Sequence, residues 1–157
     1  MKHVDYELLT QQTIAARTPY LLSFLCNVTA LPYDSLDDLN WAGFYFVKDD
    51  KLILGPFQGK IACVEIPYGK GVCGYACEHD ETTVVPDVHR FPGHIACDSA
   101  SNSEIVIPLH RDGKVIGVLD IDSPLLDRFH EEDRQGLEKV AAIIEESFSD
   151  TPSSGLI

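Results

Sequence analysis

The amino-acid sequence predicts an α+β domain built from an antiparallel β-sheet with helices on one face. Apolar residues recur at intervals of three or four near both ends of the chain, which is typical of amphipathic helices. Between these ends lie strand-like apolar runs, two of which flank the turn sequence Arg111-Asp112-Gly113. Glycine in such a turn accepts a positive φ, so the flanking runs are expected to pair as a hairpin. Helices that bracket a series of strands favour an antiparallel sheet over parallel βαβ units.

The first third of the chain is expected to form two helical segments and a hairpin. Helical spacing of apolar residues continues from residue 5 to about residue 31, with Pro19 as a break or kink. The aromatic run 40–47 is followed by a polar turn and by an extended run at 52–54, which indicates two paired strands. Because side chains alternate along a strand, one face of the first strand carries Trp41, Gly43, Tyr45 and Val47, and the other carries Phe44 and Phe46.

The middle of the chain predicts shorter elements around a glycine-rich turn. Residues 61–66 are expected to form a strand in which Cys63 and Glu65 point to the same face. After the turn, residues 72–78 are expected to form a short helix that places Cys73 and Cys77 one turn apart. A short strand at 81–87 is stopped by Pro86, and residues 88–103 are expected to be a loop.

The C-terminal part predicts a hairpin and a closing helix. The hairpin strands span residues 104–110 and 114–123. His130 is a candidate N-cap, and acidic residues follow it in the first turn, where the helix dipole favours negative charge. The apolar stripe of the helix consists of Leu137, Val140, Ala141, Ile144 and Phe148. Residues 1–148 are therefore expected to form one domain, and residues 149–157 a polar C-terminal tail.

Length and charge exclude several classes of function. A chain of 157 residues is long enough to bury a core without disulfides or metals. Its formal net charge of −13 repels phosphate backbones and anionic membrane surfaces, so neither nucleic acid nor a membrane is an expected partner. The sequence shows no apolar signal region and no apolar run of about 18 residues, and the expected location is cytoplasmic.

The five cysteines are an odd number for an intracellular chain and argue against a static disulfide framework. Cys26 lies on the apolar face of a predicted helix and, like Cys77, is expected to be a buried apolar residue. Cys97 differs, because its neighbours are small and polar and no hydrophobic run is present to bury it. This pattern indicates a reactive thiol. A thiol that turns over through a sulfenic acid needs a resolving partner, and both Cys63 and Cys73 are candidates.

Three carboxylates near the ends of the predicted hairpin strands are candidates for proton transfer. Asp120 and Asp122 are two residues apart at the end of an apolar run, so both project to one face, beside the core. Glu104 begins the neighbouring strand. Like charges held close together raise a carboxyl pKa, which provides a proton donor near neutral pH. The competing interpretation is that all three carboxylates end strands and face water.

Two other motifs are weaker indications of a site. The sequence from Gly69 to Gly74 matches a dinucleotide-binding fingerprint and follows a strand, but the later elements pair as antiparallel hairpins and not as βαβ units. His89, His94 and Cys97 carry donor atoms that zinc accepts, but no paired C-x-x-C or H-E-x-x-H motif accompanies them. Neither a nucleotide nor a metal is therefore expected to bind.

The chain resembles the free methionine-R-sulfoxide reductases, a branch of the GAF-domain superfamily, from the N-terminal helix to Ile144. The most specific motifs are Asn40-Trp41-Ala42-Gly43-Phe44-Tyr45, Gly55-Pro56-Phe57-Gln58-Gly59, Gly69-Lys70-Gly71-Val72-Cys73-Gly74, Val85-Pro86-Asp87-Val88, Phe91-Pro92-Gly93-His94-Ile95-Ala96-Cys97-Asp98 and Gly117-Val118-Leu119-Asp120-Ile121-Asp122-Ser123. The resemblance implies a GAF-like α+β fold, with a central six-stranded antiparallel sheet flanked by helices, and a homodimer. It also implies a pocket that reduces the R epimer of free methionine sulfoxide and holds no bound cofactor.

The resemblance also assigns roles to thiols and carboxylates. It implies that Cys97 is the nucleophile, that Cys63 resolves it, and that Cys73 is a secondary thiol. Thioredoxin or another dithiol is then the external reductant. The carboxylates that surround the sulfoxide and the amino group of the substrate are Glu104, Asp120 and Asp122. Of these, either Glu104 or Asp122 is expected to donate the proton.

The aromatic strand completes the expected site. Trp41 and Tyr45 share a strand face and are expected to wall the apolar end of the pocket, where the S-methyl group sits, although both also suit a plain aromatic core. The competing function is a non-enzymatic GAF domain that senses a small ligand. Ordinary GAF regulatory domains lack the set Cys63, Cys73 and Cys97, and its presence here favours an enzymatic over a sensory function.

Overall fold

The computed structural model describes residues 4–94 and 100–149, and its strands form one six-stranded antiparallel sheet. The strand order across the sheet is β3-β2-β1-β6-β5-β4. The strands are β1 (Trp41–Lys48), β2 (Lys51–Gly59), β3 (Glu65–Pro67), β4 (Thr83–Val85), β5 (Ser103–Arg111) and β6 (Lys114–Ser123). The helices are α1 (Tyr6–Ala15), α2 (Leu21–Ser35), α3 (Gly71–His79), the 3₁₀ helix η1 (Val88–Arg90) and α4 (Glu131–Phe148). The α+β class and the six-stranded antiparallel sheet are confirmed.

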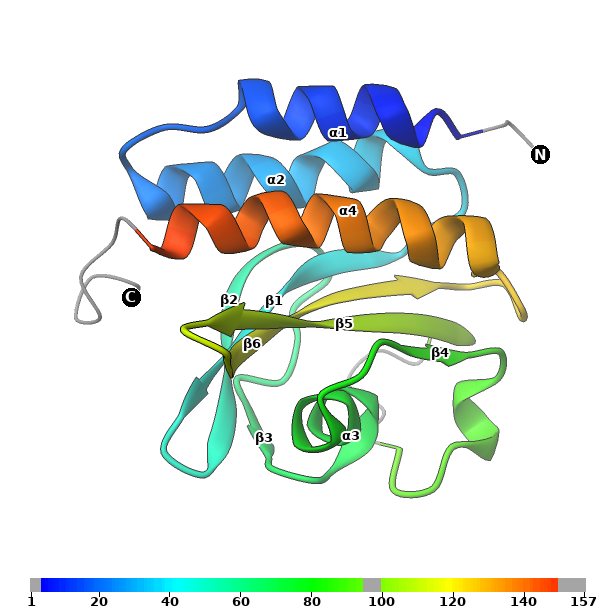
Figure 1. Ribbon diagram of the computed structural model, residues 1–157. Coiled ribbons are helices and arrows are strands. Elements are labelled where there is room, and N and C mark those ends of the chain that lie inside the picture. Colours follow the sequence, from blue (N-terminus) through cyan, green and yellow to red (C-terminus); the bar gives the residue numbers. More distant parts are fainter. Residues whose placement is uncertain (1–3, 95–99, 150–157) are drawn as a thin grey trace.

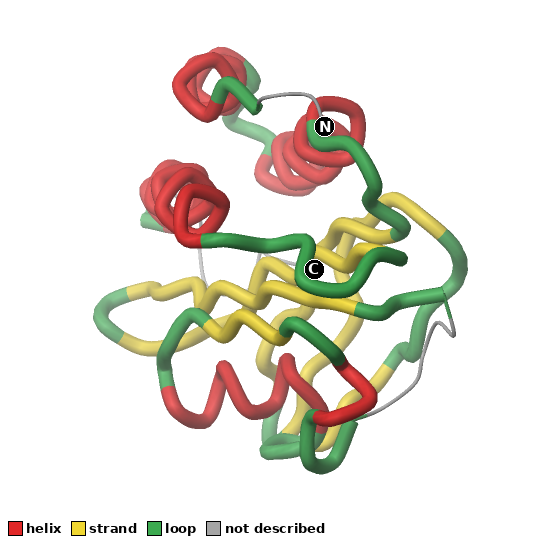
Figure 2. The backbone as a smooth tube through the Cα atoms, turned by 90° about the vertical axis from the view of Figure 1, so that its right-hand side faces the viewer, coloured by secondary structure: helices red, strands yellow, loops and turns green. Residues whose placement is uncertain are grey.

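Helices cover both faces of this sheet. In Figure 1, α1, α2 and α4 lie on one side of the sheet and α3 on the other, and Figure 2 shows the same layers after a 90° turn. Both faces of the central strands are apolar, since Phe44 and Ile105 pack with the three-helix layer while Val106 and Val118 pack with α3. Because an apolar sheet face must be buried against another element, each face is covered by helices. The expectation of helices on one face alone is therefore wrong, and the sheet flanked by helices is confirmed.

The two N-terminal helices are separated at residues 16–20, as expected around Pro19. α2 faces the core with Phe24, Leu25 and Val28, which are each 0% exposed. Cys26 directly follows Phe24 and Leu25 in sequence, and the helical rotation of about 100° per residue turns its side chain away from the core. Cys26 is exposed, so its expected place in the core is wrong.

The strand expected at 61–66 forms only from Glu65 to Pro67, as β3. β3 pairs with only the first three residues of β2, whereas β2 itself continues to Gly59. Residues 60–64 are irregular, and the prediction that Cys63 and Glu65 share a strand face is wrong. The expected loop at 88–103 contains η1 and ends earlier, because β5 begins at Ser103.

The remaining elements follow the sequence closely. The short helix expected at 72–78 is α3, and Cys77 within it is buried as expected. The hairpin turn has positive φ at Asp112 (52°) and Gly113 (77°). α4 follows His130, the expected N-cap, whose backbone N–H donates a hydrogen bond to Asp133 Oδ2 at 2.8 Å. None of the helices in the described ranges combines the length and apolar character that crossing a membrane requires.

His110 joins three elements at the end of β5. Its Nδ1 lies 3.1 Å from Glu145 Oε2 on α4, and its Nε2 lies 2.5 Å from Asp80 Oδ1, which follows α3. Partial burial opposes the charge of the imidazolium, but the hydrogen bonds and negative charges of Asp80 and Glu145 outweigh it and raise the pKa of His110. The protonated ring therefore stabilises the contact between α3, β5 and α4.

We expect His110→Gln to flatten the pH dependence of thermal stability. A histidine whose pKa is higher in the folded than in the unfolded protein stabilises the fold fully below its unfolded pKa of about 6.5, and this contribution is lost as pH rises through the raised value. The wild-type melting temperature should fall across that interval, as measured by circular dichroism. His79→Gln, which changes an exposed histidine of α3 with no ion pair to a described carboxylate, is the control and should keep the wild-type slope. An unchanged slope in His110→Gln would contradict the prediction.

Candidate active site

Strand register gathers the predicted carboxylates on the α3 face of the sheet. β6 lies between β1 and β5. In the β5–β6 pair, Glu104 stands opposite Asp122 and Val106 stands opposite Asp120. On the other side of β6, Trp41 of β1 stands opposite Asp122. Directly opposed residues place their side chains together on one face, so Trp41, Asp122 and Glu104 form a row across three strands.

Burial sets the electrostatics of this cluster. Glu104 is 7% exposed and Asp120 is 5% exposed. The Oδ1 atoms of Asp120 and Asp122 are buried and have no hydrogen-bond partner among the described residues. Burial raises the pKa of all three carboxyls well above the ordinary range, and the charge of a neighbouring carboxylate raises each further. The cluster therefore favours bound protons or a bound cation.

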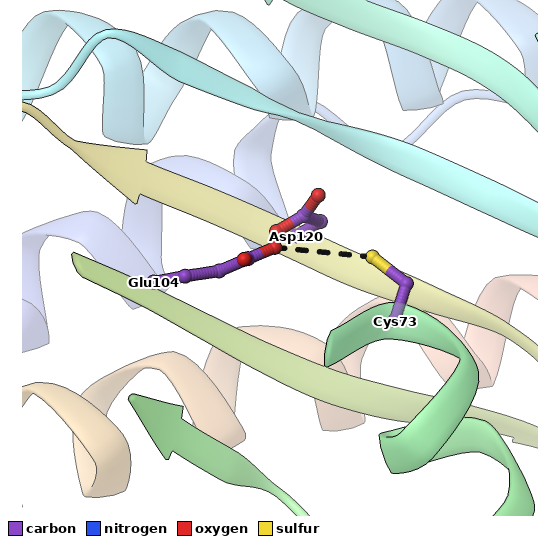
Figure 3. Close-up of side chains that lie close together, drawn as sticks. All are labelled: Cys73, Glu104 and Asp120. Atoms are coloured by element: carbon purple, nitrogen blue, oxygen red, sulfur yellow. Dashed lines mark hydrogen bonds between the residues drawn. The ribbon is translucent and has the colours of Figure 1, made fainter. Parts of the chain in front are cut away.

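Cys73 reaches this cluster from α3. Positive φ angles at Gly69 (76°) and Gly71 (65°) turn the chain from β3 into the helix, a conformation that glycine adopts without strain. Cys73 is 4% exposed, and its Sγ lies 4.0 Å from Glu104 Oε2. Figure 3 marks this contact with a dashed line. Burial, followed by the charges of Asp120 and Glu104, raises the pKa of the Cys73 thiol well above its usual value. In this arrangement Cys73 is held as a neutral thiol.

Aromatic rings form a second wall of the same pocket. Trp41 stacks on Tyr45 with 5.9 Å between ring centroids and on Phe57 with 5.3 Å. Gly43 leaves room for this arrangement, because a Cβ atom there would lie 2.7 Å from Trp41 Cη2 and 2.4 Å from Phe57 Cβ. The pocket lining includes Trp41, Tyr45, Cys73, Glu104, Asp120 and Asp122. Six of the predicted site residues thus surround one cavity.

The predicted thiols have different states. Cys63 is disulfide-bonded, whereas Cys26, Cys73 and Cys77 are free thiols. Ala62, next to Cys63, lines the pocket, so this segment borders the site. Cys97, the predicted nucleophile, lies outside the described residues.

The aromatic wall also holds the segment that carries Cys63. Trp41 Nε1–H donates a hydrogen bond to the carbonyl oxygen of Lys60 at 3.2 Å, and the Tyr45 hydroxyl donates to the carbonyl oxygen of Cys63 at 2.8 Å. Tyr45 is 2% exposed, so its hydroxyl has little access to water as an alternative partner. The two aromatic side chains therefore hold an irregular stretch, whose Val64 carbonyl oxygen also accepts a backbone hydrogen bond from Leu54 of β2 at 2.9 Å.

Sequence reasoning missed Ser101. Its hydroxyl donates a hydrogen bond to Asp122 Oδ2 at 3.0 Å and accepts one from Asn40 Nδ2 at 2.9 Å. Ser101 is 6% exposed and lines the pocket, as do His94 and Lys70. A single serine in a polar loop carries no distinguishing sequence signal, and only its approach to the end of β6 reveals the contact.

The structure describes the glycine-rich turn fully and the predicted zinc set only in part. Every strand pair of the sheet is antiparallel, so the glycine-rich turn lacks the βαβ context of a dinucleotide site. His89 Nδ1 lies 3.0 Å from Asp87 Oδ1, and the rings of His89 and His94 are 6.3 Å apart. Burial, followed by the charge of His89, lowers the pKa of His94. The third residue of that zinc set, Cys97, lies outside the described residues.

Comparison with known proteins agrees with this geometry. The sequence matches the GAF domain over residues 11–148. It is 54% identical over 138 residues to the free methionine-R-sulfoxide reductase of Escherichia coli K12, which covers 88% of this chain and 83% of that protein. The reduced form of fRMsr from Staphylococcus aureus is 50% identical and superposes with a TM-score of 0.90, over 93% of this chain and 96% of that chain.

A substrate-bound relative also has the same fold. The free methionine-R-sulfoxide reductase of Neisseria meningitidis, solved in complex with its substrate, is 41% identical, with a TM-score of 0.90 over 96% of this chain and 94% of that chain. The match therefore spans nearly the whole of both chains. By sequence and by fold, the chain belongs to the free methionine-R-sulfoxide reductases of the GAF-domain family.

Proposed function

We propose that this protein reduces free L-methionine (R)-S-oxide to L-methionine. The observation that carries the proposal is a single pocket in which three carboxylates, a thiol and stacked aromatic rings meet. Sulfoxide reduction needs an acid that protonates the departing oxygen, which a carboxyl with a raised pKa supplies. The ammonium group of the substrate needs a negatively charged partner, and the S-methyl group of the substrate needs an apolar wall.

In the proposed reaction the Cys97 thiolate attacks the sulfoxide sulfur while a carboxylic acid protonates the oxygen. The oxygen passes to Cys97 as a sulfenic acid, so the methionine sulfur gains two electrons and the Cys97 sulfur loses two. The thiol of Cys63 condenses with the sulfenic acid, which releases water and forms a disulfide. Thioredoxin or another dithiol then reduces this disulfide by thiol exchange, and Cys73 serves as a secondary thiol. The disulfide at Cys63 supports its role as the resolving cysteine.

Hydrogen bonds and burial support different roles for the three carboxylates. Ser101 donates to Asp122, which favours the charged form of that carboxyl. Glu104 is buried against Asp120, whose charge raises the pKa of Glu104 further. We assign the proton to Glu104, and we assign the substrate ammonium to Asp120 and Asp122. Trp41 and Tyr45 then wall the S-methyl group.

Tyr45→Phe should separate the two chemical steps. The variant keeps the aromatic ring but loses the hydroxyl that holds the Cys63 carbonyl, so oxygen transfer should proceed normally while disulfide formation slows by about 10- to 100-fold. The free energy of unfolding should fall by about 1 kcal/mol. Single-turnover quenching, with methionine and free thiols counted over time, measures both steps.

Tyr68→Phe is the matched control for this experiment. It also removes a tyrosine hydroxyl that takes part in a partly buried hydrogen bond, but this hydroxyl accepts from Cys77 Sγ and does not contact the Cys63 segment. Both steps should keep their wild-type rates in this variant. Equal slowing of oxygen transfer and disulfide formation in Tyr45→Phe would refute the anchoring role.

The proposed function is tested with the reduced protein, dithiothreitol and both epimers of free methionine sulfoxide. Chiral chromatography should show loss of the R epimer and formation of methionine, with the S epimer unchanged. The competing function is a non-enzymatic domain that senses a small ligand in the same pocket. If the R epimer binds, as measured by calorimetry, but is not consumed, the sensor is the correct function.

We further propose that residues 1–148 act as a single catalytic domain, with residues 149–157 as a tail, and that two copies form a homodimer. Exposed apolar side chains on the outer helices support the dimer, since Leu8, Ile14 and Leu22 are 53%, 45% and 54% exposed. Light scattering should then give twice the mass of the chain. A reducing cytoplasm suits the three free thiols of the described residues and a thioredoxin-type reductant.

A further inference from the structure

Three buried side chains from three different elements converge in the pocket. Cys73 comes from α3, Glu104 from β5 and Asp120 from β6, and Figure 3 shows their ends turned toward one another. One donor atom from each, a sulfur and two carboxylate oxygens, lies within 4.8 Å of the other two. Their exposed fractions are 4%, 7% and 5%. The donors are therefore held together inside the fold and not on a flexible surface.

Unpartnered oxygen atoms provide a second observation. Asp120 Oδ1 and Asp122 Oδ1 are buried and accept no hydrogen bond from the part of the chain that the structure describes. Buried polar atoms are normally paired, and a bound ion is one of the ways in which an unpaired oxygen in a pocket acquires a partner. No ion pair between described residues includes Glu104, Asp120 or Asp122. Lys70 lines the same pocket but forms no ion pair with these three carboxylates, so the cluster presents acceptor atoms that a bound cation would complete.

We propose that Cys73, Glu104 and Asp120 bind a thiophilic divalent cation such as Zn²⁺ in this pocket. Zinc accepts thiolate at about 2.3 Å and carboxylate oxygen at about 2.0–2.2 Å, which at tetrahedral angles places ligand atoms about 3.3–3.7 Å apart. The donor atoms of the three side chains lie within 4.8 Å of one another, so shifts of about 1 Å bring them to that spacing. Asp122 or water takes the fourth position.

The thiolate selects the kind of cation. Magnesium and calcium prefer all-oxygen ligands, whereas a sulfur donor favours zinc, cadmium and cobalt. Binding requires a deprotonated Cys73 and therefore releases protons. The cation occupies the place that the proposed function gives to the substrate ammonium, so zinc becomes a reversible inhibitor. Only this last step rests on the proposed function.

Cobalt titration of the disulfide form tests the site directly. In that form Cys63 is not a free thiol, and Cys26, Cys73 and Cys77 are the free cysteines among the described residues. No added reductant is needed, so none competes for the metal. We expect Co²⁺ to produce a near-ultraviolet thiolate-to-cobalt absorption band that saturates at one equivalent. Zn²⁺ should abolish the band, and Mg²⁺ should leave it unchanged.

Variants identify the ligands. Cys73→Ser should lose the band, whereas the matched thiol variants Cys26→Ser and Cys77→Ser should keep it. Asp120→Asn should weaken Co²⁺ binding by at least about 10-fold. Circular dichroism melting curves verify that each variant is folded. Absence of the band in the wild-type protein, or its survival in Cys73→Ser, overturns the proposed site.

Two further measurements separate this proposal from the proposed function. Free methionine, the product, should raise the apparent Kd for Co²⁺. A Kd that does not change when methionine is added overturns the overlap of the cation site with the substrate site. Reduction of methionine sulfoxide by metal-free, reduced protein is assayed on its own. Failure of that assay counts against the reductase function, while the cobalt titration still decides the metal site.

Discussion

Serine in place of Cys97 is expected to lower kcat for reduction of free methionine (R)-sulfoxide by roughly 1,000-fold or more. A serine hydroxyl is not ionised at neutral pH and does not form a sulfenic acid, so oxygen transfer and disulfide formation both stop. Chromatographic quantification of methionine with dithiothreitol as reductant measures the loss. Substrate binding should persist, because the three carboxylates and the aromatic wall remain in place.

Two other cysteine variants make this result specific. Cys26→Ser changes an exposed thiol on α2 and should keep the wild-type kcat. Cys63→Ser should form methionine in a single turnover but lose turnover driven by thioredoxin. Full activity in Cys97→Ser would assign the nucleophile to another thiol, and normal thioredoxin-driven turnover in Cys63→Ser would exclude Cys63 as the obligatory resolving cysteine.

Glu104→Gln is expected to lower kcat by about 100- to 10,000-fold, the usual contribution of a positioned general acid. The amide preserves size and burial but does not donate a carboxyl proton. The wild-type rate should fall as pH rises through the raised pKa of Glu104, because the acid then loses its proton. That alkaline limb should disappear in the variant. Steady-state rates across a pH series measure both effects.

Stability should change in the opposite direction to activity. A carboxyl whose pKa is raised by folding stabilises the folded state below its unfolded pKa, and this contribution is lost as pH rises through the raised value. Glutamine does not titrate, so Glu104→Gln should melt no lower than wild type at neutral pH and higher above it. Glu7→Gln, on the exposed surface of α1, is the control and should leave rate and stability unchanged. A large loss of stability in Glu104→Gln would mean that the rate effect reflects misfolding.

Elements with a local signal were predictable from the sequence. The turn at Asp112 and Gly113 needs positive φ at two residues, and the helix after His130 shows its cap and apolar stripe within a single stretch. The opposite faces of Trp41 and Phe44 follow from strand alternation alone. Predictions failed where an element depends on a distant partner. The strand at 61–66 shortens to β3 because only the first residues of β2 pair with it.

The sequence by itself determined the types of residue at the site and the shared face of Asp120 and Asp122, because a two-residue repeat is a property of any strand. Tertiary structure alone decided that Glu104 and Trp41 flank Asp122, since this depends on the register of β5 and β1 against β6. It also decided that Cys73 joins the carboxylates, because α3 packs on the face that the other helices leave uncovered. Register and packing are long-range quantities, and they place side chains from distant segments within contact of one another.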